Sequence, residues 1–388
     1  MILIDPPNAA GHGRLWSHLA SDTSYDELHV FARVIGVPER GFDRDHYDVP
    51  AEWYDRVVAA GATPVTSREL IVRIRAAGLR RRKTESLRPR RPGRGLLRPP
   101  LLEPGHTVAV VAPAGPADAE RVSDGVEVLR GWGLEVRTAP DPVGAAFSWL
   151  AAPDEERAAA LQSAWLDPEV AAVWCTRGGF GSHRLLDMLD WRTMATGAPK
   201  LLVGFSDVTA LHQAFAARLG VSTVHGPVLT SIEDRLPATR EALRSLVFDG
   251  VTARITGVEQ VPGTATGVLV GGNLTVLASS AGTPLTHPAT DSIAVLEDVG
   301  ESPYRLDRSL TQLLRSGWFD GVRGVVLGQF SRCGDPETVA ALLTSRLAPL
   351  GVPVLADAPI GHGESNVAIP LGVRAHLGAG RLTVDAVD

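Results

Sequence analysis

The sequence predicts an α/β fold: a parallel-sheet half, a smaller mixed α/β domain after it, and a small α/β module in front. Between residues 107 and 227, short apolar segments alternate with helical ones, a pattern typical of a parallel sheet covered by helices on both faces. From about Gly267 the pattern becomes mixed, and its tail alternates like a hairpin. Between the module and the rest, an arginine- and proline-rich stretch cannot form a packed core. The expected parts are a module at 1–82, a linker at 83–102, and domains at 103–240 and 262–388.

The composition argues against several classes of function. The formal net charge of −6 disfavours general nucleic-acid binding, and no apolar run approaches the ~20 residues needed to cross a membrane. The N-terminal residues lack the basic and apolar regions of a signal peptide. Two cysteines, Cys175 and Cys333, are too few for a disulfide framework or a metal cluster of their own. We expect a cytoplasmic protein without nucleic-acid or membrane partners.

The front module should hold a strand at 2–4 and helices at 26–35, 53–60 and 67–77. Its titratable residues gather in short clusters, which include His12, His18, Asp22, His29, Asp45, His46 and Asp48. Four histidines among several aspartates could hold a metal ion or a phosphate. Their spacing matches no metal motif, so the favoured interpretation is scattered structural polar residues.

The most informative turn runs from an apolar strand at 171–175 through three glycines into an amphipathic helix that starts at Ser182. A serine held on such a tight strand-to-helix turn can expose its hydroxyl as a nucleophile, and the N–H groups that follow can stabilise an oxyanion. The alternative is a glycine-rich turn whose serine caps the helix. The turn alone does not favour either interpretation.

A nucleophilic serine needs a base and a group that orients the base. His362 stands between two glycines, and Glu297 ends an apolar strand, so these two are the favoured partners. Ligands of parallel sheets bind beyond the carboxyl ends of the strands, where Ser206, Asp207 and His225 also lie. His225 is the strongest rival to His362 as the base; the other rivals are His183, His212 and His376.

Several motifs occur in a fixed order along the chain. They are Val-Ala-Pro-Ala-Gly-Pro at 111–116, Arg-Gly-Gly-Phe-Gly-Ser-His-Arg-Leu-Leu at 177–186, Gly-Phe-Ser-Asp-Val-Thr-Ala-Leu at 204–211, His-Gly-Pro at 225–227, Gly-Gly-Asn-Leu at 271–274, Leu-Glu-Asp-Val-Gly-Glu-Ser-Pro-Tyr-Arg-Leu-Asp-Arg at 296–308 and Gly-His-Gly at 361–363. Together they resemble the LD-carboxypeptidase family, serine peptidases of the S66 type, over residues 103–388. The front module resembles an actinobacterial domain of unknown function of the DUF4031 kind, which implies a module boundary and no activity.

The resemblance implies an α/β half, a swivelling C-terminal domain and a triad of Ser182, Glu297 and His362. It also implies a homodimer that removes the terminal D-alanine from murein tetrapeptides during cell-wall recycling. A sister branch cleaves peptide-nucleotide antibiotics and usually has asparagine before the serine. Gly181, together with Arg177, favours the murein branch. A non-catalytic scaffold or sensor, with the front module as the working part, is the third hypothesis.

In the predicted mechanism, His362 takes the proton of Ser182 while Glu297 orients the imidazole. Backbone N–H groups of His183 and Gly179 would bind the oxyanion. Arg177 or Arg305 would bind a substrate carboxylate, although a structural ion pair is as good an interpretation for either. The remaining residues expected to bind substrate are Phe180, Ser206, Asp207, His225 and Asn273. No metal or cofactor is needed.

Overall fold

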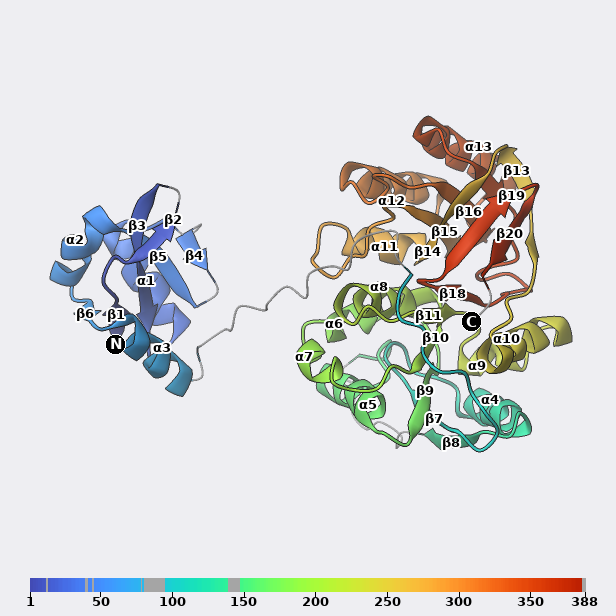
Figure 1. Ribbon diagram of the computed structural model, residues 1–388, viewed down its shortest axis with the longest axis horizontal. Helices are drawn as coiled ribbons and strands as arrows, with labels where there is room; N and C mark the ends of the chain where they lie inside the picture. The colour runs from blue at the N-terminus through green and yellow to red at the C-terminus, as the bar shows by residue number, and fades with distance from the viewer. Residues whose placement is uncertain are drawn as a thin grey trace. The chain divides into compact units, whose positions relative to one another are not determined.

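The computed structural model describes residues 1–11, 13–38, 41–43, 45–77, 79, 95–138 and 147–385. His12 and most of the predicted linker, residues 83–94, lie outside this range. Contacts divide the chain into two compact units, Met1–Ser86 and Leu87–Asp388, which are considered separately (Figure 1).

The first unit is built on a sheet with the strand order β4-β5-β3-β1-β6, and β2 pairs with β3. Its strands are β1 (Ile2–Ile4), β2 (Ala9–Gly11), β3 (Arg14–Ser21), β4 (Phe42–Asp43), β5 (His46–Pro50) and β6 (Thr63–Pro64). The pairs are antiparallel except for β1 with β6, so the sheet is mixed.

The helices expected in this unit are present. They are α1 (Tyr25–Ile35), α2 (Tyr54–Ala59) after the 3₁₀ turn η2 (Ala51–Trp53), and α3 (Ser67–Ala76). Side chains of Ser24 and Thr66 accept hydrogen bonds from the first turns of α1 and α3, which satisfies backbone N–H groups there. The buried core includes Leu19, Leu28 and Tyr47 from helix and sheet.

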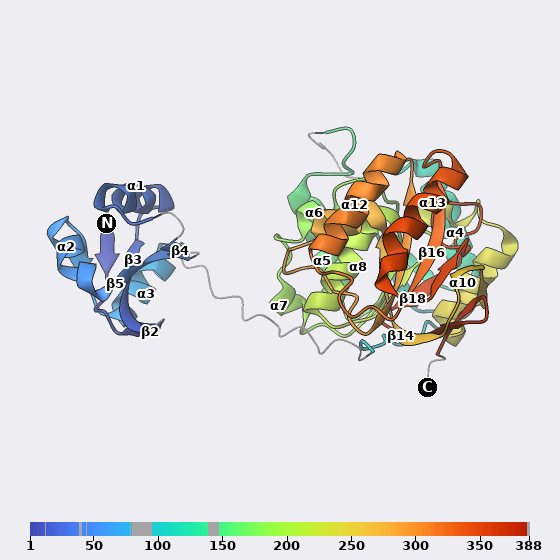
Figure 2. The same ribbon diagram turned by 90° about the horizontal axis from the view of Figure 1, so that it is seen from above.

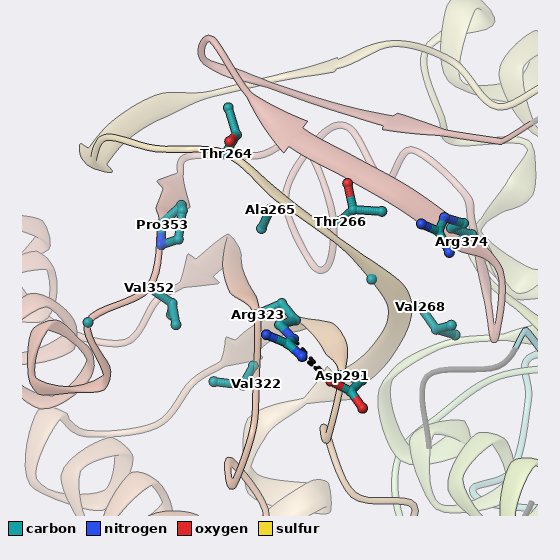
Figure 3. Close-up of a pocket in the computed structure, with 12 residues that line it drawn as sticks. Thr264, Ala265, Thr266, Val268, Asp291, Val322, Arg323, Val352, Pro353 and Arg374 are labelled. Atoms are coloured by element: carbon teal, nitrogen blue, oxygen red, sulfur yellow. Dashed lines mark hydrogen bonds and ion pairs between the residues drawn. The ribbon is translucent and has the colours of Figure 1, made fainter. Parts of the chain in front are cut away.

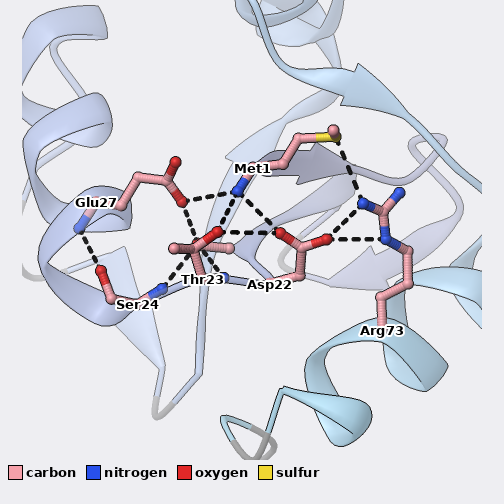
Figure 4. Close-up of polar contacts among 7 residues, drawn as sticks. Met1, Asp22, Thr23, Ser24, Glu27 and Arg73 are labelled. Carbon is pink, nitrogen blue, oxygen red and sulfur yellow. Dashed lines mark hydrogen bonds and ion pairs between the residues drawn. The ribbon is translucent and has the colours of Figure 1, made fainter.

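Ion pairs link the N-terminal residue, which precedes β1, to the segment after β3 and to α1 (Figure 4). The amino group of Met1 lies 2.8 Å from Asp22 Oδ1 and 3.0 Å from Glu27 Oε2. Arg73 of α3 donates from Nε to Asp22 Oδ2 at 3.0 Å. The hydrogen bond from the Met1 amino group, together with that from Arg73, lowers the pKa of Asp22. Burial has the opposite, smaller effect on this pKa. Asp22 therefore stays charged and links β1, the turn after β3, and α3.

The second unit contains two sheets, and the first has the order β18-β11-β10-β9-β7-β8. Its strands are β7 (Thr107–Val111), β8 (Glu135–Thr138), β9 (Val170–Cys175), β10 (Leu201–Gly204), β11 (Thr223–His225) and β18 (Ile369–Leu371). The first five are parallel, which confirms the predicted parallel sheet, and β18 is antiparallel to β11.

Helices cover both faces of this sheet. They are α4 (Ala119–Gly131), α5 (Asp154–Leu166), α6 (Ser182–Leu185), α7 (Trp191–Met194), η3 (Ser206–Val208), α8 (Thr209–Arg218), α9 (Leu229–Ile232) and α10 (Pro237–Asp249). Neighbouring residues of β9 point to opposite faces. Val173 packs in the cluster with Trp165 and Phe215, and Trp174 packs in the cluster with Leu129.

The other sheet has the order β12-β20-β19-β14-β15-β16-β17-β13. Its strands are β12 (Ile255–Thr256), β13 (Val258–Val261), β14 (Ala265–Asn273), β15 (Ser292–Val299), β16 (Gly324–Ser331), β17 (Val354–Ala356), β19 (Arg374–Gly378) and β20 (Arg381–Val384). Strands β14 to β17 are parallel, the flanking pairs are antiparallel, and β19 and β20 form the predicted hairpin.

Helices α11 (Leu274–Ser280), α12 (Pro303–Arg315) and α13 (Pro336–Leu347), followed by η4 (Ala348–Leu350), lie together over one face of this sheet (Figures 1 and 2). Strand β18 comes from the same part of the chain as β19 but pairs with the first sheet. The two sheets are thus joined by shared chain segments. Over the described ranges, no helix is both long and apolar enough to cross a membrane.

Candidate active site

Ser206 occupies a sharp turn between β10 and α8. Its φ angle is +64°, in the left-handed region that residues with side chains seldom adopt. Gly204 ends the strand, and η3 begins at Ser206, so the serine is presented at the carboxyl end of a central parallel strand. A strained strand-to-helix turn of this kind is the geometry of a nucleophile elbow.

His362 lies against this serine. Its Nε2 atom is 3.0 Å from Ser206 Oγ, a normal hydrogen-bond distance. The ring packs on Phe205, with ring centroids 4.7 Å apart. His362 follows Gly361, whose φ of +108° is readily available to glycine, and the Gly361 N–H donates to Asn366 Oδ1 at 3.0 Å.

Glu297 is the third member of this series. Its Oε2 atom is 2.6 Å from His362 Nδ1, and the carboxylate is completely buried on β15. A Cβ atom at Gly361 would lie 2.5 Å from Glu297 Oε2, so glycine permits this approach. Burial alone would raise the pKa of Glu297, but His225 and His362 lower it to about 2. Glu297 is therefore a charged carboxylate at neutral pH, hydrogen-bonded to the imidazole.

Ser182 does not make the contact that the sequence analysis expected. His362, the predicted partner of Ser182, lies within hydrogen-bond distance of Ser206 instead, through Nε2. Ser182 is fully buried; its backbone N–H donates to Asp207 Oδ2 at 2.8 Å, and its hydroxyl lies beside the same carboxylate. The glycine turn after β9 thus carries a serine that bonds to the neighbouring turn after β10. Both turns end parallel strands, and the sequence pattern did not distinguish them.

The two turns are closely packed. A Cβ atom at Gly178 would lie 2.8 Å from Ser206 Cβ and 3.3 Å from the Asp207 backbone nitrogen. Only glycine fits there without displacing the serine. Gly179, with φ of +108°, follows immediately. The backbone around Gly178 and Gly179 therefore borders the Ser206 hydroxyl, where an oxyanion would form.

A pocket of about 430 Å³ opens over Ser206. It is lined by Asp118, Arg121, Arg177, Gly178, Gly179, Phe205, Ser206, Val228, Thr230, Ser231 and His362. Arg177 donates to the Pro116 carbonyl at 2.9 Å, and Arg121 lies 3.0 Å from Asp234. The site thus combines a serine–imidazole–carboxylate series with two guanidinium groups. Of the predicted substrate-binding residues, Arg177 and Ser206 line this pocket.

The other predicted binding residues have different surroundings. His225 is buried, with Nε2 3.9 Å from Glu297 Oε1, longer than a hydrogen bond. Asn273 caps α11 and donates to Asp298 at 3.0 Å. Arg305 is exposed beside Glu301. Phe180 is exposed too.

His183, the predicted oxyanion donor, lies in α6 next to Ser182. Its ring Nε2 is 2.6 Å from Ser280 Oγ, and burial lowers the pKa of the ring. Its environment therefore fits a link between α6 and α11. The residue that follows Ser206 is Asp207, so the corresponding backbone donor at the observed turn is the Asp207 N–H.

Arg157 supports the site and was not singled out from the sequence. Its guanidinium group is buried and donates to the carbonyls of Ala152 at 3.0 Å and Gly181 at 3.1 Å, and also to Pro113. It thereby joins the glycine turn, through Gly181, to the segments at Pro113 and Ala152. The carbonyls that it binds are distant in sequence, so no local pattern indicates this role.

A second pocket, of about 540 Å³, lies on the larger sheet beside β14 and β19 (Figure 3). Arg323 crosses it and donates to Asp291 Oδ1 from Nε at 3.0 Å. Its lining includes Thr266 and Arg374 but no serine, histidine or cysteine. Ser206, with His362 and Glu297, therefore forms the better candidate for a catalytic site.

Two family models match parts of the second unit. Residues 108–226 match the LD-carboxypeptidase N-terminal domain, and residues 266–377 match the LD-carboxypeptidase C-terminal domain. The chain belongs to the LD-carboxypeptidase family. This LD-carboxypeptidase is a hydrolase of the serine carboxypeptidase type. Residues 2–77 match DUF4031, a domain of unknown function, which confirms the resemblance of the front module.

Relatives cover most of the LD-carboxypeptidase part. A protein of Streptomyces coelicolor named as a carboxypeptidase is 50% identical over 301 residues, 75% of this chain and 97% of the relative. The murein tetrapeptide carboxypeptidase of Pseudomonas aeruginosa is 37% identical over 290 residues, 71% of this chain and 94% of that protein.

Solved structures share the fold. The muramoyltetrapeptide carboxypeptidase from Oxalobacter formigenes aligns with a TM-score of 0.65 and 31% identity, over 73% of this chain and 99% of its own. An MccF-like protein from Bacillus anthracis aligns with a TM-score of 0.68 over 75% of this chain and 100% of its own. At 24% identity, that likeness concerns the fold alone.

Proposed function

We propose that this LD-carboxypeptidase uses Ser206 as nucleophile, His362 as base and Glu297 as the orienting carboxylate, and releases the terminal D-alanine of murein tetrapeptides. The observation that carries the proposal is the continuous series from Ser206 Oγ through the imidazole of His362 to Glu297, with distances of 3.0 and 2.6 Å. The triad keeps the predicted base and carboxylate and replaces Ser182 by Ser206.

The proposed reaction begins when His362 Nε2 takes the proton of Ser206 and Oγ attacks the carbonyl carbon of the scissile amide. The Glu297 carboxylate stabilises the resulting imidazolium. Backbone N–H groups of Asp207 and Gly179 would donate to the oxyanion. His362 then protonates the leaving amine, D-alanine departs, and a water activated by His362 hydrolyses the acyl-enzyme.

The proposed substrate is supported by the pocket and by relatives. A tetrapeptide that ends in D-alanine presents a free carboxylate one residue from the scissile amide, and guanidinium groups bind carboxylates well. Arg177 lines the pocket together with Ser206, so we assign it to this carboxylate. Arg305 lies outside the pocket lining, beside Glu301. The relative from Pseudomonas aeruginosa is named for murein tetrapeptide.

Two experiments test the proposal directly. The full chain is incubated with an L,D-tetrapeptide, and the products are identified by mass spectrometry; free D-alanine and the tripeptide are expected. A peptide-nucleotide conjugate serves as the alternative substrate. In parallel, a serine-directed fluorophosphonate is reacted with the protein, and the labelled peptide is sequenced.

The expected label lies on Ser206. Label on Ser182, or cleavage of the conjugate without release of D-alanine from the tetrapeptide, would overturn the assignment. Absence of both labelling and turnover would instead favour a scaffold or sensor. The predicted homodimer is proposed as well, and light scattering during gel filtration measures it.

A further inference from the structure

Three side chains of the front module meet because of strand register. Strands β3 and β5 are antiparallel, and His18 lies directly opposite Asp48. His46 precedes Asp48 by two residues on β5, so both side chains point to the same face of the sheet as His18. Their neighbours Leu19 and Tyr47 are buried on the opposite face. Residues 18 and 46 are far apart in sequence, which explains why no metal motif was visible there.

The three groups are close enough to share one ion. One ligand atom from each of His18, His46 and Asp48 lies within 4.8 Å of the others. His46 Nε2 is 3.4 Å from Asp48 Oδ1, and the two imidazole rings meet edge to face with centroids 4.9 Å apart. Metal–ligand bonds of about 2.0–2.2 Å place tetrahedral ligand atoms roughly 3.3–3.6 Å apart. Small side-chain rotations would therefore close the site.

A second layer of buried carboxylates orients both rings. Asp5, which follows β1, accepts from the His18 backbone N–H at 2.6 Å and lies 2.9 Å from its ring Nδ1. Asp45 Oδ1 lies 2.7 Å from His46 Nδ1. Both aspartates are almost completely buried. A carboxylate on Nδ1 fixes the ring and directs Nε2 to the ligand, as in carboxylate–histidine–metal arrangements.

We propose that His18 and His46, through Nε2, and Asp48, through a carboxylate oxygen, bind a divalent first-row transition-metal ion in the front module. Two neutral imidazoles and one carboxylate form a recognised set of metal ligands, and three protein ligands leave coordination positions for water or another ligand. The side chains are 31%, 16% and 46% exposed respectively, so the site opens to solvent on the Asp48 side. The site is separate from the proposed carboxypeptidase chemistry.

The ligand chemistry narrows the choice of ion. Mg²⁺ and Ca²⁺ prefer oxygen ligands, whereas imidazole suits Zn²⁺, Fe²⁺ and Ni²⁺. Three carboxylates in the cluster, Asp5, Asp45 and Asp48, also offset the charge of a dication. We therefore expect Zn²⁺ to bind more tightly than Mn²⁺, and Mg²⁺ to compete with neither.

The experiment uses the purified full chain, stripped with a chelator and then titrated with Zn²⁺ by calorimetry. Metal content is measured by plasma mass spectrometry, and Co²⁺ provides a visible spectrum that reports the ligand set. The expected result is one Zn²⁺ per chain. Both His46→Gln and Asp48→Asn should weaken Zn²⁺ binding by about 100-fold or more, and Asp5→Asn by about 10–100-fold.

His29→Gln is the matched control, since His29 lies in the same module and contacts the Tyr47 hydroxyl at 2.8 Å without belonging to the cluster. It should retain the Zn²⁺ affinity of the wild type. Thermal unfolding of each variant checks its fold; if His46→Gln fails to fold, the partly exposed Asp48→Asn decides. Failure of the wild type to take up one equivalent, or unchanged affinity in folded Asp48→Asn, would overturn the site. D-alanine release should be unchanged in His46→Gln, which separates this result from the proposed function.

Discussion

Two serines at adjacent strand ends look alike in the sequence and differ in the structure. Ser182 follows β9 through a glycine turn, and Ser206 follows β10 through Gly204 and Phe205. Ser182 is fully buried and held by Asp207, whereas Ser206 has a φ of +64° and contacts His362. A strand–turn–serine–helix pattern therefore identifies candidates, and the contact with His362, which lies between β17 and β18, distinguishes them.

The largest expected effect comes from exchanging the two serines for alanine. Ser206→Ala should reduce kcat/KM for D-alanine release by about 10⁴-fold or more, because no nucleophile remains beside His362. Ser182→Ala should reduce it by less than about 10-fold, since the backbone contact with Asp207 persists. Steady-state kinetics on a muramyl tetrapeptide measures both. Equal losses in the two variants would remove the distinction between the turns.

Glu297→Gln should lower kcat by about 10⁴-fold, because an amide can neither stabilise the imidazolium nor fix the required tautomer. Glu301→Gln is the matched control: it changes a partly exposed carboxylate beside Arg305 and should leave kcat unchanged. If Glu297→Gln retains more than a tenth of the wild-type kcat, the carboxylate has no catalytic role.

The contact between the two turns can be broken at Gly178. In Gly178→Ala, the added Cβ would lie 2.8 Å from Ser206 Cβ, so the serine must move. A displacement near 1 Å costs about 10²-fold in turnover. Gly131→Ala, where a Cβ meets nothing within 4 Å, is the control and should have wild-type activity. Normal turnover in Gly178→Ala would show that the two turns separate freely.

Part of the fold and of the candidate site can be predicted from the sequence. The choice between Ser182 and Ser206 cannot, for a physical reason. The parallel sheet and the β19–β20 hairpin follow from apolar periodicity. Glu297 and His362 are singled out by a strand end and by flanking glycines, and the structure adds their contact. The choice of serine depends on how the sheet that carries Glu297 packs against the sheet that carries Ser206. The pairing of His18 with Asp48 depends on strand register. Local patterns specify neither, because both are long-range packing results.

The pKa of Glu297 predicts a pH effect on stability. Its folded-state value of about 2 lies below its ordinary value of 4.5. The unfolded chain therefore binds this proton first, and the stabilisation is complete above about pH 4.5 and is lost as pH falls towards 2. Relative to Glu297→Gln, the wild type should lose on the order of 3 kcal/mol of unfolding free energy across that range. Denaturant titrations at a series of pH values measure the difference, and parallel curves for the two proteins would contradict it.

The smallest expected effect concerns Asp207, which belongs to the Ser206 turn and binds the Ser182 backbone. Asp207→Ala leaves the buried Ser182 N–H without its acceptor, which costs about 1–3 kcal/mol. The glycine turn should loosen, and kcat should fall by about 10-fold because Gly178 and Gly179 border the nucleophile. Asp207→Asn keeps a carbonyl oxygen at the same place, so it should recover most of the stability and activity. Burial raises the pKa of Asp207, because removal from water disfavours the charged carboxylate. Thermal unfolding and steady-state kinetics of Asp207→Ala and Asp207→Asn test this expectation. If the Asn variant is as impaired as the Ala variant, the negative charge, rather than the hydrogen bond, connects the two turns.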